Sequence, residues 1–148
     1  MELLGYGTHL MIDGYDGDRG ALAAEAVVKT LLSAISKSLE PQKTAELETY
    51  KVKHSVGISA LASLPESHVS VHTFPDLGSV SLKVFTRYQL SLEAFSTLLN
   101  DAFQCKRIEH HLSNHSKVMP IEPSEKEKVL LGDRQYSHLR LASSSRGI

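Results

Sequence analysis

The stretch Pro65-Glu66-Ser67-His68-Val69-Ser70-Val71-His72-Thr73-Phe74-Pro75-Asp76 decides how this chain folds. Residues 68–74 are typical of a β-strand, and residues 79–86 are typical of a second one. The link between them, Pro75-Asp76-Leu77-Gly78, has the composition of a turn. A link of this length joins neighbouring antiparallel strands, so the stretch predicts a hairpin inside an antiparallel sheet.

The flanking segments extend the sheet and supply helices. Apolar residues recur at three- and four-residue steps across residues 19–39, which predicts an amphipathic helix that ends before Pro41. A second helix is predicted after Ser91, whose hydroxyl suits an N-cap. Two such helices need one sheet face to cover, so we predict an α+β two-layer sandwich: a mainly antiparallel sheet covered on one face by two helices. Its strands are expected at residues 7–13, 45–53, 57–64, 68–74, 79–86 and 106–112.

Length and composition limit the classes of function. The 148 residues fit one domain, which we place at residues 1–116, and the polar segment 117–148 is predicted to be an irregular C-terminal arm or tail. A net charge of −1 gives no general attraction for nucleic acid or an anionic membrane. The single cysteine, Cys105, excludes an intramolecular disulfide, and no apolar run approaches the roughly 18 residues that span a bilayer. We therefore expect a cytoplasmic protein with no nucleic-acid or membrane partner.

The opening stretch also carries a family resemblance. Glu66-Ser67-His68 followed by His72-Thr73-Phe74-Pro75-Asp76 resembles the short prokaryotic class of S-adenosylmethionine decarboxylases. Gly57-Ile58-Ser59 and Val84-Phe85-Thr86 are similar to two further family segments at preserved spacing. The likeness covers roughly residues 5–112, more than a chance motif match would give.

This resemblance implies a self-processing S-adenosylmethionine decarboxylase of polyamine (spermidine) synthesis, which acts on a small-molecule amine or amino-acid substrate. The precursor would cleave itself between Glu66 and Ser67, and Ser67 would become a pyruvoyl group that drives decarboxylation without a metal. Ser59 and His72 match the residues that give the family its oxyanion donor and proton shuttle. Asp76 stands at the ribose-binding position and Phe74 beside it, and the family usually forms homodimers with sites near the interface.

Several positions leave alternatives open. Arg87 stands where the family has the cysteine that protonates the product, and a guanidinium stays protonated near neutral pH. Lys53 stands where an aromatic ring would stack on adenine. A pyruvoyl-dependent ornithine or arginine decarboxylase, with Arg87 gripping a carboxylate, is therefore an alternative substrate assignment, and a non-catalytic paralogue acting as partner or regulator is a third reading. His68 fits either a role in the substrate pocket or a structural role in its strand. Cys105 either starts a buried strand or takes over protonation of the product from the family's cysteine at position 87.

A metal site is not expected. His110 and His111 are neighbours on a predicted strand, so their side chains point to opposite faces.

Overall fold

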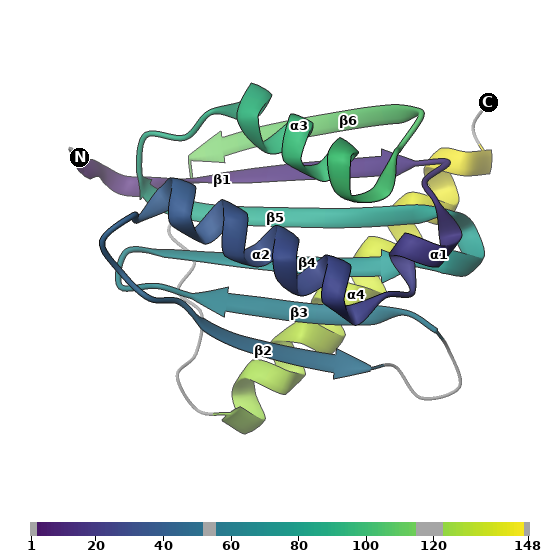
Figure 1. Ribbon diagram of the computed structural model, residues 1–148, viewed down its shortest axis with the longest axis horizontal. Helices are drawn as coiled ribbons and strands as arrows, with labels where there is room; N and C mark the ends of the chain where they lie inside the picture. The colour runs from purple at the N-terminus through teal and green to yellow at the C-terminus, as the bar shows by residue number, and fades with distance from the viewer. Residues whose placement is uncertain (1–2, 52–55, 115–122, 147–148) are drawn as a thin grey trace.

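The computed structural model describes residues 3–51, 56–114 and 123–146 and contains one antiparallel sheet between helices (Figure 1). In chain order its elements are β1 (Leu3–Tyr15), α1 (Arg19–Leu22), α2 (Glu25–Leu39), β2 (Glu46–Lys51), β3 (Ile58–Ser63), β4 (Ser67–Phe74), the 3-10 turn η1 (Pro75–Leu77), β5 (Ser79–Tyr88), α3 (Leu92–Phe103), β6 (Arg107–Asn114) and α4 (Pro123–Arg146). No helix among the described residues is long and apolar enough to cross a membrane.

The six strands lie in the order β2-β3-β4-β5-β1-β6, and each pairs antiparallel with its neighbours. The predicted hairpin is present: β4 and β5 run side by side from Ser67 opposite Thr86 to Phe74 opposite Ser79. Gly78 closes the turn at φ +65°, a left-handed conformation that glycine adopts without steric cost. The antiparallel sheet and its hairpin are thus confirmed.

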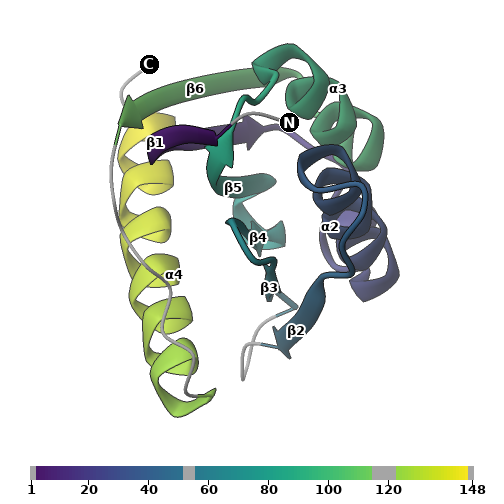
Figure 2. The same ribbon diagram turned by 90° about the vertical axis from the view of Figure 1, so that its left-hand side faces the viewer.

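Helices α2 and α3 cover one face of the sheet, as predicted (Figure 2). The buried side of α2, including Leu32 and Ile35, packs in one core with sheet residues such as Val69 and Val71. Ser91 caps α3, its Oγ accepting the Ala94 N–H at 3.2 Å.

The helix predicted over residues 19–39 is interrupted. It divides into α1 and α2, because Ala23 ends the first and Ala24 has an extended backbone. Asp18 caps the short α1 by accepting the Ala21 N–H at 2.8 Å.

The predicted irregular arm over residues 117–148 was wrong for most of its length. Residues 123–146 form α4, which lies against the opposite face of the sheet (Figure 2). Leu130 and Leu141 are buried there, but the positions between them that face the sheet are polar, among them Arg134 and Ser137. Apolar periodicity, on which the sequence prediction relied, is therefore missing from a helix that packs largely through hydrogen bonds and ion pairs.

Candidate functional site

Strand β4 places the two halves of the opening motif on different faces of the sheet. Side chains alternate along a strand, so Ser67 shares its face with Val69 and Val71, under α2. His72 and Phe74 belong to the other face, under α4. Ser67 and His72 are five residues apart, or about 16 Å along the strand. One chain therefore does not bring these two predicted catalytic side chains together.

The Glu66–Ser67 bond is held firmly at the start of β4. The Ser67 hydroxyl is buried and lies 2.8 Å from Thr86 Oγ1. The Glu66 carbonyl oxygen accepts the Arg87 backbone N–H at 3.1 Å. The Glu66 N–H donates to Glu40 Oε2 at 3.2 Å, so both sides of this residue's backbone are fixed.

This backbone donor is a feature that the sequence reasoning missed. The Arg87 N–H is aimed at the carbonyl oxygen on which negative charge would develop if Ser67 attacked the Glu66 carbon. Any residue other than proline at position 87 would supply it, so residue type gives no signal. The β4–β5 register, with Ser67 opposite Thr86, is what reveals it.

The Arg87 side chain pairs with Glu66, its Nη1 lying 2.9 Å from Glu66 Oε2. Both side chains are partly exposed, and both belong to the α4 face. Beside them His68 stacks on Phe85, with ring centroids 5.1 Å apart and an interplanar angle of 14°. The guanidinium at position 87 is therefore engaged with the residue that precedes Ser67.

His72 and Ser59 form the second half of the site. They are directly opposite on β4 and β3, and His72 Nδ1 lies 3.0 Å from Ser59 Oγ. Burial of the imidazole, followed by the positive charges of Lys83, Arg134 and Arg140, lowers the pKa of His72 to about 3. The ring is therefore neutral at physiological pH, and its buried Nε2 has no hydrogen-bond partner among the described residues.

Helix α4 covers this second half. Arg134 donates to Ser59 Oγ at 3.2 Å and to the Thr73 carbonyl at 2.8 Å, and its guanidinium lies 4.4 Å from the centre of the Phe74 ring. Phe74 is thus enclosed between the sheet and α4, whereas Asp76, in η1, is exposed. Lys53 lies outside the described residues, so its predicted place beside a substrate stays a prediction.

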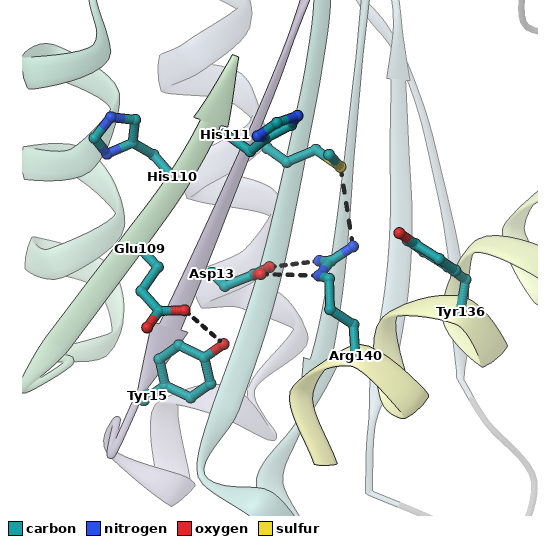
Figure 3. A pocket seen from close by; sticks show the side chains of 8 residues that line it. Asp13, Tyr15, Glu109, His110, His111, Tyr136 and Arg140 are labelled. Carbon is teal, nitrogen blue, oxygen red and sulfur yellow. Dashed lines mark hydrogen bonds and ion pairs between the residues drawn. The ribbon is translucent and has the colours of Figure 1, made fainter. Parts of the chain in front are cut away.

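A separate cavity of about 400 Å³ lies between α4 and the β1–β6 edge (Figure 3). Asp13 is held there by Arg140, whose Nε donates to its Oδ2 at 2.9 Å. His110 and His111, which are neighbours on β6, both line this cavity. Within the described ranges no group of three or more histidine, cysteine or acidic side chains is placed to hold a metal ion.

Cys105 lies away from both halves of the site. It packs into the core on the α2–α3 face, and burial, with a smaller contribution from Asp16, raises the pKa of its thiol to about 11. Its place in the core and a pKa that makes the thiol a weak acid fit the structural alternative rather than the role of substitute acid.

Comparison with known proteins assigns this arrangement to a family. The family model described as S-adenosylmethionine decarboxylase matches residues 8–115. The chain belongs to the S-adenosylmethionine decarboxylase family. The resemblance drawn from Glu66–Asp76 is thereby confirmed, and the match ends before α4 begins.

Two relatives show how much of the chain is shared. The S-adenosylmethionine decarboxylase proenzyme of Synechococcus sp. (strain WH7803) is 29% identical over 124 residues, which are 83% of this chain and 94% of that protein. The proenzyme of Parasynechococcus marenigrum (strain WH8102) is 30% identical over 127 residues, 77% of this chain and 87% of the relative.

The solved structures support the fold. The adenosylmethionine decarboxylase from Aquifex aeolicus VF5 superposes with a TM-score of 0.63 at 20% identity, covering 82% of this chain and 98% of that one. This confirms the α+β sandwich.

Proposed function

We propose that the chain cleaves itself between Glu66 and Ser67 and then acts as a pyruvoyl-dependent S-adenosylmethionine decarboxylase. The observation that carries the proposal is the fixed Glu66–Ser67 bond, with a buried serine hydroxyl on one side and a backbone N–H on the carbonyl oxygen. The names of the relatives, which are called proenzymes, support the same reading.

The cleavage is an N-to-O acyl shift followed by elimination. Ser67 Oγ bonds to the Glu66 carbonyl carbon, the C–N bond breaks, and the hydroxyl proton passes to the released amine, which leaves an ester. Loss of the Ser67 α-proton then expels the Glu66 carboxylate and leaves dehydroalanine. Water replaces the nitrogen, ammonia departs, and Ser67 has become a pyruvoyl group. The Arg87 N–H stabilises the oxyanion of the first step.

We further propose a homodimer in which two copies complete one site. His72 and Ser59 are about 16 Å along β4 from Ser67 and on the other face, so their proton transfer would act on the Glu66–Ser67 bond of a second copy. Coexpression of Ser67→Ala and His72→Ala chains tests this. In the mixed dimer the Ser67→Ala chain supplies His72 to the His72→Ala chain, which keeps its own Ser67. We therefore expect the His72→Ala chain to be cleaved in the mixed dimer and to stay whole when it is expressed alone. Equal cleavage of His72→Ala in both settings contradicts the shared site.

The residues present fit a pyruvoyl group at position 67, because the side chain there is buried and next to Thr86. When formed, the group supplies an electron sink for the C–C bond that breaks on loss of CO₂. Once the bond is cut, Arg87 faces a Glu66 that carries two carboxylates, and His68 lies beside them to orient substrate. Asp76, in η1 beyond the other end of β4, would contribute from the opposite end of the strand.

Intact mass and denaturing gels test self-cleavage. The purified chain is expected to yield fragments 1–66 and 67–148, and Ser67→Ala is expected to remain a single band. Loss of His72 is expected to slow elimination, so His72→Ala should accumulate an ester that hydroxylamine cleaves. A chain that stays whole after long incubation at neutral pH would contradict the proposal.

The position of Arg87 keeps a second substrate class open. A guanidinium can form a bidentate pair with a carboxylate, and ornithine and arginine each carry an α-carboxylate that could be bound in this way. If the enzyme acts on S-adenosylmethionine, Arg87→Cys should raise its slow turnover, because replacing a positioned acid by water costs about 10²–10⁴ in rate. If it acts on ornithine or arginine, the same change should lower activity on them. Cleavage at Ser67 without turnover of any of the three favours a non-catalytic partner of an active enzyme.

A further inference from the structure

Helix α4 is attached to the sheet mainly by charged contacts. Arg134 bonds Ser59 and the Thr73 carbonyl. Arg140 pairs with Asp13 in two places and also donates to Ser81 at 2.8 Å. The apolar contribution is small: among the α4 side chains that the structure describes, Leu130 and Leu141 are the buried apolar ones, whereas Leu131, Tyr136 and Leu139 are exposed.

The sheet is shaped to receive Arg134. A Cβ at Gly57 would meet the Arg134 guanidinium directly and would lie 2.8 Å from the Thr73 oxygen. The guanidinium therefore occupies the space that glycine leaves, between the Phe74 ring and the ends of β3 and β4. The contact between α4 and the His72–Ser59 pair is accordingly an enclosed one.

The same contact opposes the chemistry assigned to this pair. Arg134 occupies an acceptor site on Ser59 and brings positive charge toward His72, so an imidazolium there is disfavoured. His72 is fully buried beneath the helix, and its Nε2 has no partner among the described residues through which a proton could pass. A second copy cannot reach either side chain while α4 remains in place.

We propose that α4 is an autoinhibitory cover, latched by Arg134, which competes with a second copy of this chain for the sheet face that carries His72 and Ser59. The inference rests on the proposed self-cleavage and the shared site. When the helix leaves, Ser59 regains its acceptor site, His72 becomes accessible, and the face can meet the Glu66–Ser67 bond of the partner copy. The rate of cleavage is then set by the fraction of time for which the Arg134 contacts are broken and α4 is away from the sheet.

The experiment uses the full chain with Arg134→Ala. Arg107→Ala is the matched control, because Arg107, like Arg134, lies over an aromatic ring, Tyr15 at 4.1 Å, while its ion pair is with Glu109 on its own strand and not with α4. Because charge-assisted hydrogen bonds are lost, Arg134→Ala should release fragment 67–148 about tenfold faster than the unchanged chain, and its dimer fraction in sedimentation velocity should rise. Arg107→Ala should match the unchanged chain.

A second readout does not depend on cleavage. In a Ser67→Ala background, the acylation of His72 by diethyl pyrocarbonate is followed by peptide mass mapping. Faster acylation of His72 in Arg134→Ala than in Arg107→Ala supports the cover. If this difference is seen but the chains that keep Ser67 do not cleave themselves, the proposed function has failed and the cover has not. Equal acylation in the two, or slower cleavage in Arg134→Ala, overturns the cover.

A cysteine pair gives a variant that keeps Arg134. The hydroxyls of Ser81 and Ser137 lie 3.4 Å apart, so Ser81→Cys with Ser137→Cys should form a disulfide that ties α4 to β5. In the Ser67→Ala background we expect His72 acylation to be suppressed by oxidation and restored by a reductant. Acylation that is unaffected by the disulfide overturns the cover.

Discussion

The buried His72 gives a prediction for stability against pH. Its pKa is lowered to about 3 in the folded chain, from an ordinary value of 6.5, so the unfolded chain binds more protons between those two values. The stabilising contribution is fully present above about pH 6.5 and is lost as the pH falls toward 3. Integrated from pH 7 to pH 5, the loss is about 2 kcal/mol of the free energy of unfolding.

Urea unfolding at pH 7, 6 and 5 measures this loss. The Ser67→Ala chain, which keeps the material uniform, is compared with the same chain carrying His72→Asn, whose amide can still bond Ser59. Because the remaining histidines are common to both, the difference between the two pH profiles isolates His72. We expect the chain with His72 to lose about 2 kcal/mol more on acidification. Parallel profiles would refute the reasoning, since they would mean that His72 titrates alike in the folded and unfolded chain.

Three further outcomes follow from the described contacts. Arg87→Ala removes a partly exposed ion pair to Glu66 but keeps the backbone N–H, so thermal denaturation should show a change of no more than about 1 kcal/mol and gels should still show cleavage. Ser91→Ala removes the α3 cap and should cost about 1 kcal/mol in urea unfolding, whereas Ser91→Asp should largely restore it. Phe95→Ala empties a core position that is 1% exposed and should cost about 3–5 kcal/mol, with no loss indicating that α3 is not packed as described.

Much of the sheet could be predicted because its signals are local. Pro75 and Gly78 mark the β4–β5 turn, and α2 and α3 each carry an apolar stripe against the core. Helix α4 lacked that signal. Arg134 is held by hydrogen bonds to Ser59 and Thr73, and Arg140 by an ion pair with Asp13; all of these partners lie far away in the sequence. A polar helix of this kind has the same hydropathy as a polar tail, so hydropathy does not separate the two.

The catalytic roles of the site residues came from the family resemblance and stay predictions. The structure adds a contact that the sequence reasoning did not predict: Ser59 and His72 lie opposite each other on paired strands. Within one chain Ser67 lies apart from them, because an odd separation along a strand puts side chains on opposite faces. The partner of Ser67 is Thr86, which only the register of β5 could identify.

The strand order determines what a cut between Glu66 and Ser67 would leave behind. Residues 1–66 contribute β1, β2 and β3, and residues 67–148 contribute β4, β5 and β6. In the order β2-β3-β4-β5-β1-β6 the two pieces alternate, so β1 is enclosed by strands of the other piece and each piece alone is a sheet with a gap. The intact chain folds as a unimolecular reaction, but two pieces must meet before they can refold. After cleavage, recovery from denaturation would therefore depend on protein concentration, and a dilute sample that had once unfolded would not return.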